Sequence, residues 1–447
     1  MSTPKTVSIY TLGCKLNFSE SSTLGRMLRA RGYELIPFEK GADLYIINTC
    51  SVTDFADRKC RKIIRRARRH NPQARIIVTG CYAQLKPDEI ADIEGVHMVL
   101  GAREKFQLLD YLEQLDSAHA VPLVAVSAVD EARFSHAYSF GDRLRSFLKI
   151  QDGCDYVCSF CTIPKARGKS RSAPMESLIE QAHQLASQGV KEIVLTGVNV
   201  GDYGKLEPEQ RHRYHLIDLI RALDRVEGIE RYRISSIEPN LLTDEILAFI
   251  ADSRAFMPHF HIPLQSGSNK ILRRMRRRYM RELYADRIRA VRHYLPDACI
   301  GVDVIVGFPG ETDEDFRDSY RFIQQLDVNY LHVFTYSERS GTPAASMPDK
   351  VPMHIRRQRS QLLRALSLRK RRAFYEKNLR QTHRVLLEPS PHEGKLEGFT
   401  ENYIRVLVEA PPSMINHIMP IHLDQLIGEE LVQGSLAHTP QPEKLNI

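Results

Sequence analysis

The chain has 447 residues, of which 43% are hydrophobic and 26% charged, a balance typical of a soluble globular protein with two to four domains. No stretch approaches the ~20 consecutive apolar residues of a membrane helix, and no signal peptide is expected, which favours the cytoplasm over a membrane or an export route. The formal net charge of +8 indicates a polyanionic partner if the basic residues cluster.

Residues 1–125 alternate apolar strands, expected over 7–13, 43–49 and 75–80, with helices, which predicts a doubly wound parallel sheet. A cysteine follows each strand. The carboxyl ends of parallel strands converge on one crevice, so these three cysteines can meet in space. We call Cys14, Cys50 and Cys81 the N-terminal triplet and expect it to hold a metal cluster rather than to be three buried apolar side chains.

Two further cysteines do not fit this pattern. Cys60 lies inside a basic helix expected over 54–70, and Cys299 begins a later strand, so both are interpreted as structural. Residues 126–145 have weak periodicity and are expected to form a linker.

A second cysteine group has the pattern C-x3-C-x2-C and consists of Cys154, Cys158 and Cys161, which we call the barrel triplet. Three thiolates can hold an iron–sulfur cluster, and because a closed 4Fe–4S site takes four cysteines, three leave one iron open to a ligand. A zinc site would need a fourth ligand nearby, and the next histidine, His183, falls on a predicted helix. A disulfide conflicts with a reducing cytoplasm.

Residues 146–380 are predicted to form a partial TIM-type (β/α)6 barrel followed by a basic helix. Polar or glycine-rich segments lie at the carboxyl ends of four of its strands, where the chemistry of such barrels takes place. The six strands are expected over 145–152, 191–199, 231–239, 259–267, 299–309 and 329–337.

Basic residues concentrate in three runs. The helix expected over 356–384 contains 11 Lys or Arg and one acid, 58–69 contains eight basic residues in twelve, and 273–278 contains five in six. One such run is usually a solvated face, but three favour a surface that binds a phosphate backbone. The densest part, Arg369, Lys370, Arg371 and Arg372, is the candidate contact.

Residues 381–438 have short alternating strands, expected over 383–388, 394–400, 403–408 and 427–432, with Gly and Pro turns that predict a small β-barrel. Residues 439–447 are expected to be a loose tail.

Several of these motifs carry a resemblance to a known family. Thr11-Leu-Gly-Cys-Lys-Leu-Asn17, Asn48-Thr-Cys50 and Thr79-Gly-Cys81 resemble the N-terminal domain of the methylthiotransferases. The barrel triplet resembles the radical S-adenosylmethionine superfamily, and the last barrel resembles a TRAM domain, which binds tRNA. The first motif is most similar to the MtaB branch, although Leu16 and Phe18 stand where that branch often has Val and Gln.

The resemblance covers nearly the whole chain and implies a cytoplasmic enzyme with two 4Fe–4S clusters and S-adenosylmethionine. The implied reaction replaces the C2–H bond of N6-threonylcarbamoyladenosine, beside the anticodon of tRNA, with C2–SCH3. The barrel triplet would hold the radical-generating cluster and the N-terminal triplet the cluster that supplies sulfur. An electron donor such as flavodoxin or ferredoxin is implied, and neither membrane nor DNA is expected. The cofactor-binding residues implied are Thr196, Gly197, Asn199, Ser235, Glu238, Gln265, Gly307 and Pro309.

Radical chemistry fits a C–H bond that side-chain acid–base groups do not activate, and no Ser-His-Asp or paired-carboxylate constellation is expected from the sequence. Three alternatives stay open: a methylthiotransferase acting on isopentenyl-adenosine in tRNA, the sister enzyme acting on an aspartate of a ribosomal protein, and a non-catalytic iron–sulfur protein that binds RNA or senses redox state. The basic runs favour tRNA over the ribosomal protein, and glycine-rich strand ends favour an enzyme over the non-catalytic protein.

Overall fold

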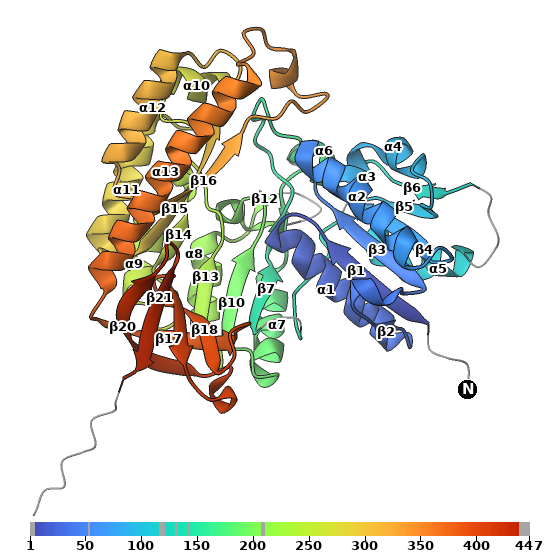
Figure 1. Cartoon of the computed structure of the whole chain (residues 1–447), viewed down its shortest axis with the longest axis horizontal. Helices are drawn as coiled ribbons and strands as arrows, with labels where there is room; N and C mark the ends of the chain where they lie inside the picture. The colour runs from blue at the N-terminus through green and yellow to red at the C-terminus, as the bar shows by residue number, and fades with distance from the viewer. Residues whose placement is uncertain are drawn as a thin grey trace, which may run out of the picture.

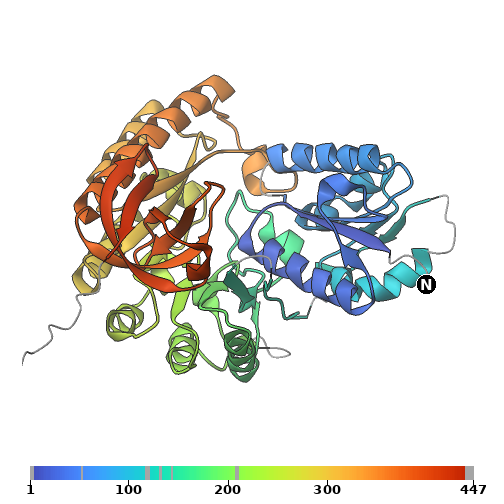
Figure 2. The ribbon, with the colours of Figure 1, turned by 60° about the horizontal axis from the view of Figure 1, so that its bottom comes forward.

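The computed structural model describes residues 5–51, 54–115, 121–129, 133–141, 144–206 and 211–437. The expected tail over 439–447 and parts of the expected linker lie outside these ranges. An N-terminal α/β unit lies beside a central barrel, and a small C-terminal barrel packs against the lower end of the central barrel in the view of Figure 1 (Figures 1 and 2). Within the described ranges, none of the helices has the length and apolar character needed to span a bilayer.

The N-terminal unit is a six-stranded parallel sheet in the order β2-β1-β3-β4-β5-β6. The side chains of β3 alternate between its faces: Leu44 and Ile46 pack with α1, whereas Tyr45 and Ile47 pack with α2. Helices therefore cover both faces, and the predicted doubly wound sheet is confirmed. The elements are β1 (Thr6–Thr11), α1 (Lys15–Ala30), β2 (Glu34–Leu35), β3 (Leu44–Thr49), α2 (Asp54–His70), β4 (Arg75–Gly80), α3 (Cys81–Leu85), α4 (Pro87–Ala91), β5 (Met98–Leu100), α5 (Leu108–Leu115) and β6 (Leu123–Ala125).

The central unit is an open barrel of six parallel strands, as predicted. Two three-stranded sheets, β7-β10-β13 and β14-β15-β16, are joined by parallel bridges from Tyr232 to Phe256 and from Ser236 to His261. The strands are β7 (Arg145–Lys149), β10 (Glu192–Thr196), β13 (Arg231–Ile234), β14 (His259–His261), β15 (Cys299–Val306) and β16 (Tyr330–Thr335). They are shorter than expected because the polar residues at their carboxyl ends turn into loops.

Helices cover the outside of this barrel. They are α7 (Met175–Ser187), α8 (Leu216–Asp224), α9 (Asp244–Asp252), α10 (Asn269–Arg274), α11 (Arg281–Tyr294) and α12 (Asp313–Gln325), whereas the short α6 (Ile163–Arg167) packs against α3 of the N-terminal unit. The acidic start predicted for α12 is part of a capping box, in which Thr312 and Asp315 each accept a hydrogen bond from the other's backbone N–H. Two short antiparallel pairs decorate the barrel: β8 (Gln151–Asp152) with β9 (Arg171–Ser172), and β11 (Lys205–Leu206) with β12 (Arg211–His212).

The long basic helix, α13 (Met353–Asn378), packs along the barrel and ends earlier than the expected residue 384. Leu379 is extended and ends the helix, and Arg380, with a φ of +63°, turns the chain into the next strand. Part of the positive charge of α13 points inward, because Arg356 pairs with Glu338 at 2.6 Å and Arg359 pairs with Glu311 at 2.6 Å. These two arginines therefore fasten the helix to the barrel and do not contribute to a basic surface.

The C-terminal unit is a closed five-stranded barrel in the order β17-β18-β19-β21-β20, which fits the predicted TRAM-like fold. One expected strand was wrong: residues 427–432 include the turn at Gly428 that connects two strands. The element missed was β20, whose Pro420 and mixed polar pattern give little strand signal. The strands are β17 (Thr382–Pro389), β18 (Lys395–Thr400), β19 (Arg405–Glu409), β20 (Ile418–Ile427) and β21 (Leu431–Leu436).

Candidate active site

The N-terminal triplet lies at the carboxyl edge of three adjacent strands, β1, β3 and β4. Cys14 is the N-cap residue of α1, Cys50 directly follows β3, and Cys81 begins α3. Gly13 makes their approach possible: its φ is +101°, and a Cβ at this position would lie 2.7 Å from the Cβ of Cys50. The fold thus brings all three thiols to one edge, as the strand pattern predicted.

The barrel triplet lies on the loop between β8 and α6. The backbone N–H of Tyr156 donates to Cys154 Sγ, and that of Ile163 donates to Cys161 Sγ, each at 3.4 Å. Arg277 Nη1 lies 3.1 Å from Cys158 Sγ. Burial, with a smaller contribution from neighbouring thiols of the triplet, raises the pKa of Cys154 to about 11 and that of Cys161 to about 12. Holding these buried groups as thiolates requires positive charge beside them, which a metal cluster supplies.

A buried ionic network separates the two triplets and joins the two units that carry them. Glu20 of α1 contacts Lys105 at 2.6 Å, Lys149 at 3.1 Å and Arg167 at 3.0 Å. Asp152 contacts Lys149 at 2.6 Å, Arg167 at 3.0 Å and Arg171 at 3.2 Å.

Four cations thus face two carboxylates, an excess of two positive charges. Burial alone would raise the pKa of Glu20, but Arg167, Lys105 and Lys149 hold it well below its usual range. This excess of positive charge is favourable because the cysteine sites that flank the network carry anionic thiolates.

A cavity of about 700 Å³ lies where the three units meet. Its wall includes Cys14 from the N-terminal triplet, strand-end residues of the central barrel, and aromatic residues of the C-terminal barrel. Tyr403 stacks on His259 with ring centroids 3.8 Å apart, and on Phe399 at 4.6 Å. The wall contains Gly13, Cys14, Lys15, Thr196, Gly197, Ser235, Ser236, His259, His261, Asp303, His332, Arg371, Phe399 and Tyr403.

A smaller pocket of about 240 Å³, which we call the side pocket, opens beside this cavity, and both are lined by Cys14 and Lys15. The partly desolvated surroundings of the Lys15 ammonium group, together with the nearby cations Arg145 and Arg233, lower its pKa to about 8.

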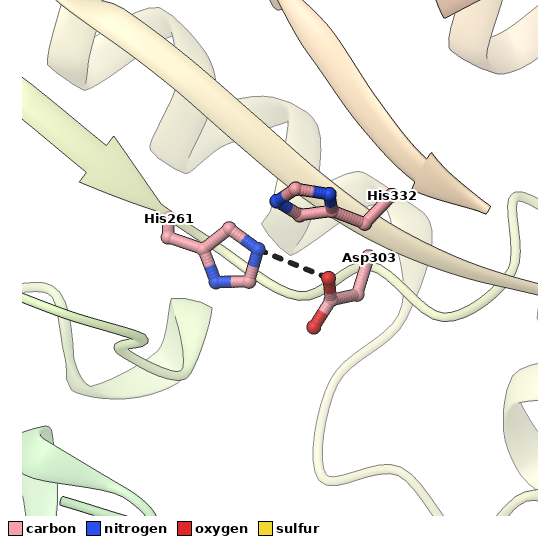
Figure 3. Close-up of side chains that lie close together, drawn as sticks. All are labelled: His261, Asp303 and His332. Carbon is pink, nitrogen blue, oxygen red and sulfur yellow. Dashed lines mark hydrogen bonds and ion pairs between the residues drawn. The ribbon is translucent and has the colours of Figure 1, made fainter. Parts of the chain in front are cut away.

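Three neighbouring strands, β14, β15 and β16, bring His261, Asp303 and His332 together on the cavity wall (Figure 3). His261 Nε2 lies 3.0 Å from Asp303 Oδ1, and its Nδ1 lies 2.7 Å from Ser236 Oγ. The expectation that no Ser-His-Asp constellation exists was therefore wrong. This array could not be predicted because Ser236, His261 and Asp303 are far apart along the chain and meet only through parallel strand pairing.

The same cluster has the composition of a divalent-metal site. One ligand atom from each of His261, Asp303 and His332 lies within 4.8 Å of the others. Both ring nitrogens of His261 already have partners, so a metal ion would have to replace the bond to Asp303.

Comparisons with known proteins match this architecture. Residues 148–323 match the model of the Radical SAM superfamily, and residues 6–101 match that of Uncharacterized protein family UPF0004. A threonylcarbamoyladenosine tRNA methylthiotransferase MtaB of Bacillus subtilis is 42% identical over 94% of this chain and 93% of the relative. The MtaB of Aquifex aeolicus is 40% identical over 90% and 96%. The chain belongs to the radical S-adenosylmethionine methylthiotransferase family. It is therefore a transferase whose cofactors are 4Fe–4S clusters and S-adenosylmethionine.

Two more distant matches set the limits of this similarity. A tRNA-2-methylthio-N(6)-dimethylallyladenosine synthase of Opitutus terrae is 32% identical over 96% of this chain and 98% of the relative. Among solved structures, the radical S-adenosylmethionine methyltransferase TsrM of Kitasatospora setae is 17% identical, covers 77% of both chains and superposes with a TM-score of 0.55, which supports the fold.

The residues of this methylthiotransferase fit its cofactors in two ways. The excess positive charge of the ionic network lies between the two triplets. In addition, two of the predicted S-adenosylmethionine-binding side chains are buried without hydrogen-bond partners among the described residues: both amide atoms of Asn199 and the hydroxyl of Ser235. Buried polar groups are normally satisfied, so these atoms are available to a ligand.

The other predicted cofactor residues divide into two groups. Thr196 and Gly197, like Ser235, line the cavity. Glu238 instead pairs with Arg277, the partner of Cys158. Gln265 has a φ of +68° and forms a bridge with Val304. Gly307 and Pro309 flank Phe308, which packs edge-on against Phe160 of the barrel-triplet loop. The second group is thus placed to support the site and does not line the cavity.

The four candidate RNA contacts on α13 have partners within the chain. Arg369 donates to the Tyr320 hydroxyl, Lys370 to the carbonyls of Gln324 and Leu326, and Arg372 to Glu376. Arg371 pairs with Glu430 and lines the cavity.

The run over 273–278 requires a correction, because Arg277 is buried beside Cys158 and does not face solvent. The charge run alone predicts that this arginine lies on a phosphate-binding surface.

Proposed function

We propose that this methylthiotransferase replaces the C2–H bond of N6-threonylcarbamoyladenosine, beside the anticodon of tRNA, with a methylthio group. The names of the relatives that are 42% and 40% identical support this substrate. The observation that carries the proposal is the single cavity in which Cys14 of the N-terminal triplet faces the strand-end residues Thr196, Gly197 and Ser235. The sulfur-supplying site at Cys14 and the S-adenosylmethionine site at the strand ends can therefore both reach one bound base.

The barrel triplet would hold the 4Fe–4S cluster that binds S-adenosylmethionine, and the N-terminal triplet would hold the second cluster. When bound, these groups supply a radical able to remove hydrogen from an unactivated C–H bond, together with sulfur for the product. Asn199 and Ser235 would hold polar groups of S-adenosylmethionine with the atoms that have no partner in the described part of the chain. Arg277 would hydrogen-bond to the cluster through Cys158.

The nucleoside itself must leave its stack to enter the cavity. Phe399, Tyr403 and His259 form a continuous aromatic stack on the cavity wall, against which an extruded base can pack. Asp303 and His332 offer acceptor and donor atoms to the edge of that base. The C-terminal barrel and the basic residues Arg369, Lys370, Arg371 and Arg372 would contact the phosphates of the anticodon stem-loop. The reductant would be a small donor such as flavodoxin or ferredoxin, the compartment the cytoplasm, and DNA is not a proposed partner.

The test is mass spectrometry of tRNA nucleosides and ribosomal proteins from a strain that lacks the gene. The 2-methylthio derivative of threonylcarbamoyladenosine should disappear and return with the wild-type gene. It should not return with a variant in which the N-terminal triplet is changed to alanine. Unchanged levels of this nucleoside, together with loss of 2-methylthio-dimethylallyladenosine or of a methylthiolated ribosomal aspartate, would contradict the proposal.

A further inference from the structure

The side pocket has an unusual set of wall residues. Three cationic side chains line it, Lys15, Arg145 and Arg233, and no carboxylate is among its lining residues in the described part of the chain. Apart from Cys14 and His259, the rest of its wall is apolar or aromatic and includes Phe18, Phe147, Val194 and Tyr403. A pocket of about 240 Å³ with such a wall fits a small anionic group.

A charge count identifies the cation that has no counter-ion. Arg145 contacts Glu388 at 2.9 Å, and Arg233 contacts Glu192 at 2.9 Å. Both arginines are also held over aromatic rings of the C-terminal barrel, at 4.7 Å from Phe399 and 5.1 Å from Tyr403 respectively. Lys15 forms no ion pair or hydrogen bond with any residue in the described ranges.

Lys15 is exposed and lines both pockets, so its ammonium group can pair with a carboxylate that a ligand brings into the side pocket. Lys15 is therefore the cation available to an anionic substrate group.

The position of Lys15 next to Cys14 indicates which part of the substrate it meets. In adenine, C2 and the N6-bearing carbon flank the same ring nitrogen, N1, so they lie on one edge of the base. If C2 faces the sulfur site at Cys14, the N6 substituent must lie immediately beside it. The side pocket occupies that place, because it shares Gly13, Cys14 and Lys15 with the main cavity.

We propose that Lys15 is a specificity-determining residue that pairs, in the side pocket, with the carboxylate of the N6-threonylcarbamoyl group. This inference rests on the proposed function. A dimethylallyl group has no charge and would leave Lys15 unpaired, so the pocket selects the threonylcarbamoyl nucleoside over the dimethylallyl one. Part of this selection arises from the cost of burying Lys15 against an apolar group.

The test is a double-mutant cycle that removes either end of the ion pair. One RNA is an anticodon stem-loop with N6-threonylcarbamoyladenosine, and the other carries the same substituent without its carboxylate. The proteins, all loaded with clusters, are the wild type, Lys15→Met, Lys15→Arg and the surface control Lys350→Met. Dissociation constants are measured at one fixed salt concentration.

For the wild type, removal of the carboxylate should weaken binding about tenfold, as expected for loss of a charge-assisted hydrogen bond. Lys15→Met should weaken binding of the carboxylate RNA to a similar extent and should bind the two RNAs equally. Lys15→Arg should retain most of the preference, and Lys350→Met should behave as the wild type. Iron content should be the same in all four proteins; if Lys15→Met loses iron, Lys15→Gln takes its place in the same cycle.

A Lys15→Met enzyme that keeps the full preference for the carboxylate would overturn the inference. Failure of the proposed function gives a different result: the wild type itself would show no preference for the carboxylate RNA and would methylthiolate a dimethylallyladenosine stem-loop instead.

Discussion

Glu20→Gln tests whether the buried ionic network holds the N-terminal unit against the barrel. Glu20 is fully buried and contacts Lys105, Lys149 and Arg167 within 3.1 Å. The substitution preserves shape but raises the excess charge of the network from two to three. Removing one partner from a buried ion pair costs ~3–5 kcal/mol. With a urea dependence near 2–3 kcal/mol per molar, the first unfolding transition should move to lower urea by about 1–2.5 M.

The assay is urea unfolding of the cluster-loaded protein, followed by circular dichroism and by iron release. Glu113→Gln is the matched control: its carboxylate is exposed and 3.8 Å from Arg31, so the shift should correspond to less than about 1 kcal/mol. Because the pKa of Glu20 is lowered in the folded state, its contribution is present above the usual value of 4.5 and is lost as pH falls through the folded value. The urea midpoints of the wild type and of Glu20→Gln should therefore converge as the pH is lowered. Equal midpoints for Glu20→Gln and Glu113→Gln at pH 7 would refute the role assigned to the network.

Four further outcomes are expected. Anaerobically reconstituted protein should hold about eight irons, four per cluster, and replacement of the barrel triplet by alanine should leave about half; complete loss of iron would show that the two sites are not independent. Gly13→Ala should displace Cys50, so S-adenosylmethionine cleavage should continue while methylthiolation stops, whereas loss of cleavage as well would place the damage elsewhere. Arg277→Leu removes a cation 3.1 Å from Cys158 Sγ and should shift the reduction potential of the barrel cluster to more negative values in an EPR-monitored titration; an unchanged potential would argue against this contact. Changing Arg369, Arg371 and Arg372 together to alanine should weaken tRNA binding. The slope of log affinity against log salt should fall by about 0.9 for each duplex phosphate that the protein no longer neutralises. An unchanged slope would place the RNA-binding surface elsewhere, with Arg58–Arg69 the next candidate.

Local patterns made the sheet, the barrel and both cysteine triplets predictable. Each member of the N-terminal triplet follows a short apolar strand, and strand direction alone then places the thiols on one edge. The Ser236–His261–Asp303 array had no such signal, because its geometry depends on which strands become neighbours.

Charge runs were the weakest guide. A basic side chain looks the same in the sequence whether it will face a phosphate or a buried carboxylate. Arg277 and Arg359 belong to basic runs, yet their partners are Glu238 and Glu311, 39 and 48 residues away. Lys15 was visible as part of a motif, but only the side pocket reveals that its charge has no counter-ion among the described residues.

The attachment of the C-terminal barrel has a consequence for how this protein can change over time. Arg231 and Arg233 of β13 donate to the backbone carbonyls of Arg384, Phe399, Thr400 and Glu401. Every amino acid supplies a carbonyl, so this docking survives substitutions of the side chains that follow the same strands. The outward-facing side chains of the C-terminal barrel can therefore change while Phe399 and Tyr403 keep their place on the wall of the cavity.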